Sequence, residues 1–282
     1  MSLTSARSFL FVPASRPERF AKALGSGADC VVIDLEDAVV PSDKDRARAL
    51  LADALQAFDA SRLGRTLVRI NAAETEWHAA DLQAIAAGCA SGLCGVMAPK
   101  AESVETLRAV ASALGPSASL VPLVESLAGL DALREIARAP QVRRLAFGHI
   151  DFQLDLGMRC TPDEPELAAV RFQFVAASRR AALAAPIDGV TVNVSDSARL
   201  RHDALRARAM GFGAKLCIHP SQADAVNAAF TPAAAEVDWA RRVVQAAQAS
   251  GGAVIQVDGK MVDLPVIRLA QQTLAQASAA GE

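Results

Sequence analysis

Two apolar segments of this chain each lead directly to a carboxylate. Residues 121–124 precede Glu125, and residues 145–150 precede Asp151. Each segment has the composition of a buried strand, so each acid is expected where a strand ends at the mouth of a sheet. Two such carboxylates on neighbouring strands can share one oxygen-seeking cation such as Mg²⁺. The pattern predicts a metal site at Glu125 and Asp151; the alternative is a pair of strand-end acids that simply face water.

Charged or hydrogen-bonding side chains also end almost every other apolar segment. They are Asp34, Glu36, Asp37, Arg69, Lys100, Asn193 and His219. Folding alone does not require so many charges along one rim, and the repulsion between the acids would be costly without cations. Arg69, Lys100 and a divalent metal would supply the positive charge. Of these residues, His219 is interpreted as a hydrogen-bonded strand-end residue rather than as a catalytic base.

The elements that must position these residues alternate regularly between strand and helix. Apolar segments expected as strands occupy residues 8–13, 30–35, 66–71, 93–98, 120–125, 144–150, 188–193 and 214–219. Helical periodicity follows each of them, over residues 17–24, 44–58, 76–87, 104–114, 130–139, 167–184, 198–210 and 222–230. Near-continuous apolar strands indicate a parallel sheet that is buried on both faces. Eight such units predict an α/β fold of the (β/α)8 TIM-barrel type, with working residues at the carboxyl ends of the strands. An open doubly wound sheet is the alternative, but no strand is followed by the Gly-x-Gly-x-x-Gly phosphate turn.

The remainder of the chain lies outside the eight units. We therefore expect a barrel domain over residues 1–230 and a C-terminal helical extension over residues 231–282, which packs on the barrel or on a neighbouring subunit. In the extension, a helix over 231–250 should end at Gly251-Gly252, followed by a short strand over 253–257 and a final helix over 265–279.

Composition excludes several classes of partner. The chain has 282 residues with 29 Lys and Arg against 31 Asp and Glu, a net charge of −2. This leaves no basic surplus for nucleic acid or an anionic membrane, and no apolar run approaches the ~20 residues that span a bilayer. The start of the chain lacks the order of a signal peptide. The 5 cysteines are odd in number and form no CxxC pair, so we expect reduced thiols in a cytoplasmic protein. A catalytic role for Cys160 is the less favoured reading.

Several motifs in a fixed order carry a resemblance to a known family. They are the segment 7–13, Asp34-Leu35-Glu36-Asp37 with the residues after it, Val68-Arg69-Ile70-Asn71, Pro99-Lys100, the strand ending at Glu125, Gly148-His149-Ile150-Asp151-Phe152, the segment 217–222 and the segment 258–263. Together they resemble the acyl-CoA lyases of the citrate lyase β-subunit and malyl-CoA lyase family, over nearly the whole chain.

The resemblance implies a function and a set of site residues. A lyase of this type splits a 3-hydroxyacyl-CoA, similar to citryl-CoA or malyl-CoA, into an acyl-CoA and a 2-oxo acid. The resemblance implies that Glu125 and Asp151 bind Mg²⁺, that Glu36 and Asp37 accept hydrogen bonds from metal-bound water, and that Arg69 binds the substrate carboxylate or carbonyl. It further implies a homotrimer. Asp263 would then be the acid or base, reaching from the tail into the active site of its own or an adjacent subunit.

Two positions depart from the family pattern. His149-Ile150 stands before Asp151, where small residues are more usual, and Ser126 follows Glu125, where Thr is common. Both positions concern substrate shape more than the metal, so the particular acyl group stays open. Two alternative functions also stay open: a metal-dependent aldolase that acts on free 2-oxo acids without CoA, and a non-catalytic subunit of a lyase assembly.

Other basic residues have both a functional and a structural interpretation. Arg16, Arg19 and Lys22, where the first helix opens, are candidate contacts for the phosphates of CoA, and plain surface residues are the alternative. Lys100 is interpreted as a charge partner, because cleavage through a metal-supported enolate needs no Schiff-base lysine. Lys215 and His202, with the basic run over 199–208, are interpreted as a solvated helix face.

Overall fold

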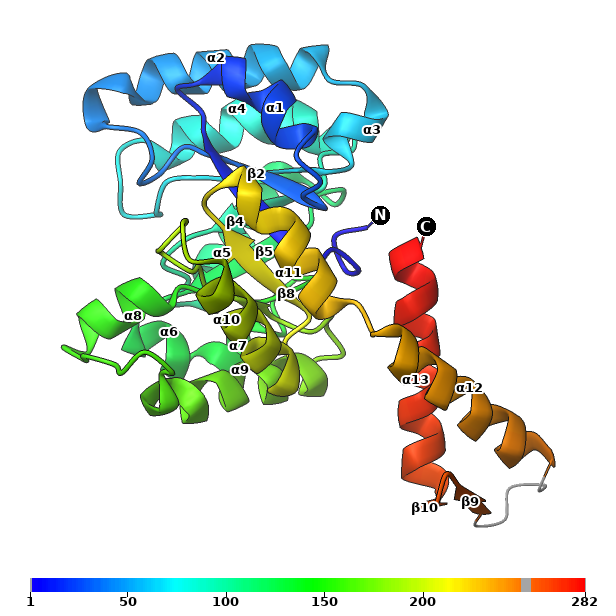
Figure 1. Ribbon diagram of the computed structural model, residues 1–282. Helices are drawn as coiled ribbons and strands as arrows, with labels where there is room; N and C mark the ends of the chain where they lie inside the picture. The colour runs from blue at the N-terminus through cyan, green and yellow to red at the C-terminus, as the bar shows by residue number, and fades with distance from the viewer. Residues whose placement is uncertain (1, 250–254, 282) are drawn as a thin grey trace. The chain divides into compact units, whose positions relative to one another are not determined.

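The computed structural model describes residues 2–249 and 255–281. The chain divides into two compact units, one of residues 2–227 and one of residues 228–282 (Figure 1). Each unit is described by itself below.

The first unit is a closed barrel of parallel strands that follow one another around the ring in chain order. Its strands are β1 (Ser8–Pro13), β2 (Cys30–Asp34), β3 (Thr66–Arg69), β4 (Gly95–Ala98), β5 (Leu120–Val124), β6 (Ala146–Phe147), β7 (Ile187–Asp188) and β8 (Ala214–Cys217). The ring is closed by pairing of β8 with β1, in the register Phe9 with Leu216. The predicted (β/α)8 barrel is therefore confirmed.

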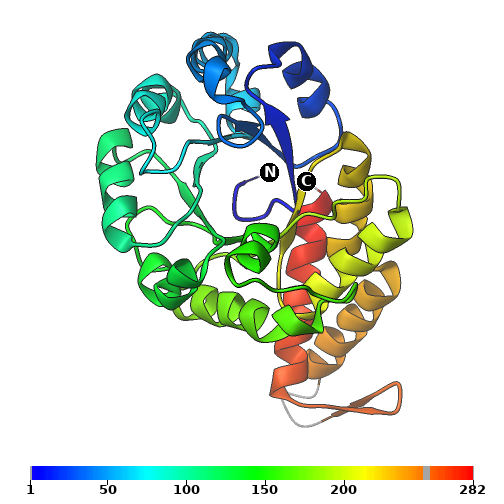
Figure 2. The same ribbon diagram turned by 90° about the vertical axis from the view of Figure 1, so that its left-hand side faces the viewer.

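Helices surround the strands as an outer ring (Figure 2). They are α1 (Phe20–Leu24), α2 (Lys44–Ala57), α3 (Ala60–Leu63), α4 (His78–Ala90), α5 (Val104–Leu114), α6 (Leu127–Asp131), α7 (Leu133–Ile136), α8 (His149–Asp155), α9 (Ala168–Arg180), α10 (Ser197–Ala209) and α11 (Ala223–Phe230). Short 3-10 turns, η1 (Pro17–Arg19), η2 (Pro41–Asp43), η3 (Pro165–Leu167) and η4 (Pro220–Gln222), precede α1, α2, α9 and α11. Each of these turns opens on a proline, whose fixed φ and missing N–H suit the first position of a helix.

Large apolar side chains fill the inside of the barrel. Phe9, Val32, Leu67, Met97 and Leu216 belong to one buried cluster to which most of the strands contribute. Because the interior is packed, the open space lies at the ends of the strands, where the chain passes into the loops.

Strands β6 and β7 are shorter than the sequence predicts. The strand expected over 144–150 ends at Phe147, because Gly148 is the N-cap of α8 and its carbonyl accepts the N–H of Phe152. The strand expected over 188–193 ends at Asp188. Asn193 instead accepts the N–H of Ser195 through its side chain, the local turn that Asn favours over a strand.

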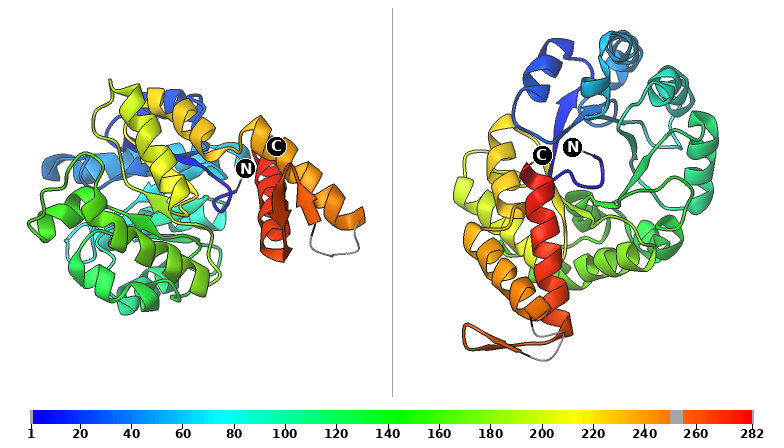
Figure 3. Two further views of the ribbon diagram at one scale, coloured as in Figure 1. Left: turned by 60° about the horizontal axis from the view of Figure 1, so that its bottom comes forward. Right: turned by 90° about the vertical axis from the view of Figure 1, so that its right-hand side faces the viewer.

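The C-terminal unit is a helical hairpin with a small sheet. Helices α12 (Ala234–Ala249) and α13 (Leu264–Gly281) pack side by side, and β9 (Ile255–Val257) pairs antiparallel with β10 (Lys260–Val262) (Figure 3). Its core includes Val243, Val257, Val262 and Ala270. The predicted helix break at Gly251-Gly252 lies outside the described residues.

Candidate active site

Strands β2 and β3 bring an aspartate and an arginine to the same level of the barrel rim. Asp34 is the register partner of Arg69. The guanidinium Nε and Nη2 of Arg69 donate to the two carboxylate oxygens of Asp34 at 2.7 and 2.6 Å. Asp34 in turn accepts the backbone N–H groups of Glu36 and Ala38. The pair therefore holds both the arginine and the loop that carries Glu36 and Asp37.

Arg69 also faces two further carboxylates. Its Nη1 lies 2.9 Å from Glu36 and 3.4 Å from Asp37, and its guanidinium lies 4.8 Å from the centroid of the Phe11 ring. Burial alone would lower the pKa of Arg69, but the charges of Asp34, Glu36 and Asp37 outweigh it and hold the pKa above its usual range. Arg69 is thus a fixed positive charge at the rim.

The buried Glu36 side chain retains its proton to a higher pH than an ordinary carboxyl. Burial, with repulsion from Asp37, Glu125 and Asp34, raises its pKa to about 8 despite the charge of Arg69. Its loop is anchored by Lys44, whose Nζ donates to the Leu35 and Glu36 carbonyls at 2.6 and 2.7 Å. Lys44 is a positioning residue that the sequence analysis missed, since a lysine in an amphipathic helix gives no sign that its ammonium is buried.

Glu125 follows β5 directly and is only 5% exposed. Its Oε1 accepts the backbone N–H of Lys100 at 2.9 Å. Burial raises its pKa to about 7; the hydrogen bond from Lys100 lowers it, and repulsion from Asp151 raises it. The Glu125 side chain occupies space that is free only because residue 148 is a glycine. A Cβ at Gly148 would lie 2.5 Å from Glu125 Oε2.

Asp151 reaches the same rim from a helix rather than from a strand. It is exposed and lies in the first turn of α8. The prediction that Asp151 directly follows an apolar strand was therefore wrong. Asp151 nevertheless acts electrostatically on Glu125, and both acids line the same cavity.

These residues line a cavity of about 270 Å³. Arg69, Glu125, His149 and Asp151 provide its polar groups, and its apolar wall consists of Phe11, Leu123, Phe147, Ile150, Val190, Val192 and Leu216. An apolar cavity with a few convergent charges is the usual form of a small-molecule site. Glu36 and Asp37 do not line the cavity; they pair with Arg69, which does.

An ionic network lies between the barrel wall and its helices near this cavity. Glu164 meets Arg171 at 2.5 Å, Arg206 at 2.9 Å and His149 Nε2 at 3.4 Å. Burial would raise the pKa of Glu164, but His149 and Arg171 hold it well below its usual range. Because His149 is part of this network, the network fixes the start of α8 and hence the position of Asp151.

Lys215 belongs to the same network, which corrects its interpretation as a solvated residue. Only 1% of Lys215 is exposed. Its ammonium donates to the Gly189 carbonyl at 2.6 Å and lies 3.7 Å from Asp188, which also pairs with Arg171. A lysine inside a strand can be buried when a carboxylate on the next strand faces it.

A second cavity, of about 420 Å³, lies between β1, α1 and the start of η4. Arg19 and Lys22 line it, together with Phe11 and Ile218. Arg16 is exposed and pairs with Glu18 at 2.6 Å, outside the lining of the cavity. His219 also lines it, and its ring accepts the N–H of Ser221 in a helix cap, as expected for a strand-end residue.

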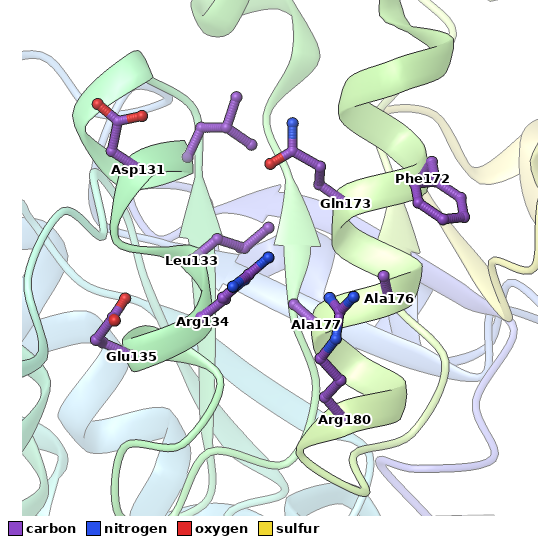
Figure 4. Close-up of a pocket in the computed structure, with 10 residues that line it drawn as sticks. Asp131, Leu133, Arg134, Glu135, Phe172, Gln173, Ala176, Ala177 and Arg180 are labelled. Carbon is purple, nitrogen blue, oxygen red and sulfur yellow. The ribbon is translucent and has the colours of Figure 1, made fainter.

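A third cavity, of about 480 Å³, lies on the outer surface between α7 and α9 (Figure 4). Arg134 and Arg180 extend into it from opposite helices, and Gln173 lies above them in this view. None of the predicted site residues lines it, so size alone does not identify the candidate active site.

Asp263 lies in the C-terminal unit, at the start of α13. Its Oδ1 accepts the backbone N–H of Val266 at 3.3 Å. This is the geometry of a helix N-cap, and it leaves the other carboxylate oxygen for a further contact.

Comparison with known proteins shows which family the chain resembles. The profile of the HpcH/HpaI aldolase/citrate lyase family matches residues 7–220. The chain is 38% identical to a (3S)-malyl-CoA thioesterase of Cereibacter sphaeroides over 276 residues, which cover 97% of this chain and 95% of the relative. It is 34% identical to the citrate lyase subunit beta of Escherichia coli, covering 98% and 94%.

A solved structure is similar over nearly the whole chain. The protein CitE from Mycobacterium tuberculosis, in complex with magnesium, acetoacetate and coenzyme A, matches with a TM-score of 0.84 and 35% identity, covering 98% of this chain and 100% of that one. The citrate lyase beta subunit of the same organism, complexed with oxaloacetate and magnesium, matches with a TM-score of 0.70 and 36% identity, covering 82% and 100%.

Proposed function

The chain belongs to the HpcH/HpaI aldolase/citrate lyase family, and we propose that it is a Mg²⁺-dependent lyase that cleaves a 3-hydroxyacyl-CoA into an acyl-CoA and a 2-oxo acid. The observation that carries this proposal is the meeting of Glu125 and Asp151 at the mouth of the 270 Å³ cavity, with the Arg69 guanidinium on its wall. Family members are enzymes, and relatives have been crystallised with magnesium, coenzyme A and oxaloacetate.

The two carboxylates fit a divalent cation. Glu125 is buried and repelled by Asp151, which keeps its pKa near 7 as long as no cation offsets the charge. Within residues 2–249 and 255–281 no cluster of three or more His, Cys, Asp or Glu side chains could hold a metal. Glu125 and Asp151 line the same cavity and are proposed as the two protein ligands. A site with only two carboxylates suits Mg²⁺, which usually keeps several positions for water and substrate oxygens. Bound there, Mg²⁺ would stabilise negative charge on substrate oxygens.

Acidic neighbours extend the site on the side of Arg69. Glu36 and Asp37 are proposed to accept hydrogen bonds from metal-bound water. The Oε2 of Glu36 is buried without a hydrogen-bond partner among the described residues, although Arg69 lies 2.9 Å away as an ion pair. A carboxylate oxygen has two lone pairs, so Glu36 Oε2 can accept a bond from a water or a ligand as well as pair with Arg69.

Arg69 and Asp263 are proposed to have different roles in the reaction. Arg69 is proposed to bind the carboxylate or carbonyl of the 2-oxo acid, because its planar fork is held rigid by Asp34 and lines the cavity. The apolar wall excludes water from the bond that breaks. Asp263 is proposed to be the acid or base that exchanges a proton with the substrate, supplied by the C-terminal unit of the same or an adjacent subunit in a homotrimer.

The thioester is proposed to lie along the cavity beside β1. Arg19 and Lys22 supply positive charge there for the phosphates of CoA. Lys22→Ala should then raise KM for a CoA thioester and leave kcat near its wild-type value. Arg16→Ala is the matched control, since Arg16 pairs with Glu18 outside the lining of the cavity. An equal effect of both substitutions would mean a diffuse surface potential rather than a phosphate site.

Thioester hydrolysis is the second candidate, favoured by the 38% identity to a (3S)-malyl-CoA thioesterase. The two reactions can be distinguished by their products. With (3S)-malyl-CoA and Mg²⁺, a lyase releases glyoxylate and acetyl-CoA, whereas a thioesterase releases malate and a free CoA thiol. An aldolase for free 2-oxo acids would bind them with Mg²⁺ and show no rise in melting temperature on addition of CoA or its thioesters. A non-catalytic subunit would give no products under any of these conditions.

The metal assignment has its own test, by calorimetry. Glu125→Ala and Asp151→Ala should each abolish Mg²⁺ binding and turnover while circular dichroism shows an intact fold. Unchanged Mg²⁺ affinity in either variant would remove that residue from the site.

A further inference from the structure

Two cysteines from distant parts of the sequence meet at the amino end of the barrel. Cys30 is the first residue of β2, and Cys94 directly precedes β4. Their sulfur atoms lie 4.0 Å apart, although 64 positions separate the residues in the chain. This is the end of the barrel opposite to Glu125 and Arg69, so the proposed reaction uses neither thiol.

The register of the barrel explains why the two side chains meet. Strand β3 separates β2 from β4; Val31 pairs with Thr66, and Leu67 pairs with Gly95. Cys30 and Cys94 therefore enter the barrel on either side of β3 at nearly the same level. Both pack in the interior cluster, where the curvature of a closed sheet brings inward side chains together.

The surroundings give the two thiols different properties. Cys30 is buried and Cys94 is only partly buried, so a small reagent has access to Cys94 first. The hydrogen bond between them raises the pKa of Cys30, and burial adds to this; the same bond lowers the pKa of Cys94. Cys94 is accordingly the better nucleophile of the pair, because the thiolate is the reactive form.

We propose that Cys30 and Cys94 are an oxidation site, at which a peroxide converts the two thiols into an intramolecular disulfide. The Cys94 sulfur attacks one peroxide oxygen, the O–O bond breaks, and the second oxygen leaves as water after taking the thiol proton. This forms a sulfenic acid on Cys94. The Cys30 sulfur then attacks that sulfur, the S–O bond breaks, and a second water carries away the Cys30 proton. Two thiols and one hydrogen peroxide thus give one disulfide and two waters.

Formation of the disulfide requires local movement of the backbone, because β3 lies between the two cysteines. A disulfide bond is about 2.05 Å long, so the sulfurs must approach by roughly 2 Å from their separation of 4.0 Å. Cys30 is fixed in a strand, but Cys94 lies in the segment between α4 and β4, outside both elements. The N–H of Cys94 bonds to the carbonyls of Leu63 and Thr66 at 2.9 and 3.0 Å, so closure of the disulfide must loosen these bonds at the amino end of β3 and β4.

The test is a peptide map of the full-length protein after treatment with hydrogen peroxide. The expected product has lost about 2 Da, contains a cross-linked peptide that joins Cys30 to Cys94, and recovers both thiols with dithiothreitol. Cys94→Ser should abolish the cross-link. Cys160→Ser is the matched control: this partly buried cysteine belongs to another loop, and its removal should leave the cross-link unchanged.

Two results would overturn the proposal. One is a folded wild-type protein in which Cys30 and Cys94 both stay alkylatable at a peroxide concentration that oxidises Cys160. The other is a cross-link that involves a different pair of cysteines. In Cys30→Ser, a sulfenic acid trapped by a dione reagent on Cys94 is expected, since the resolving thiol is gone; its absence would show that Cys94 is not the attacking sulfur.

Discussion

Arg69 and Asp34, each at the end of its strand, form a two-point ion pair across the rim of the barrel, with N–O distances of 2.7 and 2.6 Å. Their pairing follows from the register of β2 and β3. Asp34 also accepts two backbone N–H groups from the loop behind it. One buried aspartate therefore fixes the arginine that faces the cavity and the loop that carries Glu36 and Asp37.

Arg69→Lys is expected to reduce kcat/KM on the order of 100-fold, because an ammonium cannot hold Asp34 at two points and still face the substrate. Mg²⁺ affinity, measured by calorimetry, should stay near the wild-type value. Arg48→Lys is the matched control, since Arg48 pairs with Asp81 at 2.8 Å away from the cavity and should affect stability alone. Wild-type kinetics in Arg69→Lys would assign substrate binding to another residue.

The stability of the metal-free protein should depend on pH in a defined direction. Burial raises the pKa of Glu125 to about 7 and that of Glu36 to about 8, from 4.5. A raised pKa means that the folded state binds the proton more tightly than the unfolded chain. The two carboxyls therefore contribute most to the free energy of unfolding below pH 4.5. As the pH rises, each contribution falls by about 1.4 kcal/mol per pH unit, up to pH 7 for Glu125 and pH 8 for Glu36.

Urea unfolding in the presence of a chelator, between pH 5 and 8, measures this loss. The double variant Glu36→Gln/Glu125→Gln should flatten the profile, because it removes both titrating carboxyls. Added Mg²⁺ should stabilise the wild-type protein increasingly as the pH rises, since only ionised carboxylates bind it. An equally steep profile in the double variant would show that other groups cause the pH dependence.

Gly148→Ala tests whether the space beside Glu125 is needed. The new Cβ would lie 2.5 Å from Glu125 Oε2 and 2.6 Å from its Cβ, so the carboxylate must move. We expect a loss of about 1–3 kcal/mol in the free energy of unfolding and a Mg²⁺ affinity lower by about 10–100-fold. In Gly25→Ala the added Cβ meets its nearest atom at 3.4 Å, and both quantities should stay near wild type. Normal metal affinity in Gly148→Ala would place the cation elsewhere.

The sequence predicted the barrel and its rim because both depend on local patterns. Apolar runs followed by helical periodicity located the eight strands, and the polar residue after each run located Asp34, Arg69 and Glu125. The buried charges were not predictable in the same way. Lys44 and Lys215 are recognisable as buried only when their partners are known. These are Asn71, in the segment after β3, for Lys44 and Asp188 for Lys215.

The ends of β6 and β7 were mispredicted for a different reason. Valine and isoleucine at 150, 190, 192 and 194 give those segments strand-like composition, but Gly148 begins a helix and Asn193 makes a local turn. Capping and turn hydrogen bonds outweighed strand propensity at both places. No helix in residues 2–249 or 255–281 combines the length and apolarity needed to cross a membrane.

A capping role and an acid–base role of Asp263 predict different results for Asp263→Asn. Its Oδ1 caps α13 through the N–H of Val266, and asparagine caps a helix about as well as aspartate. If capping were its only role, Asp263→Asn would keep both stability and turnover. The proposed acid–base role instead requires normal melting temperature and Mg²⁺ binding, with turnover reduced by ~100-fold or more. Wild-type turnover in Asp263→Asn would leave Asp263 as a cap.

Mixing variants then tests whether the C-terminal unit of one subunit serves the barrel of another. Asp263→Asn and Glu125→Ala are each expected to be inactive alone. If the active site is shared between subunits, an exchanged mixture contains some sites with both native residues, and part of the activity should return. Native mass spectrometry of differently tagged variants confirms that subunits have exchanged and gives the oligomeric state. Confirmed exchange without recovered activity would mean that Asp263 acts only on the barrel of its own chain.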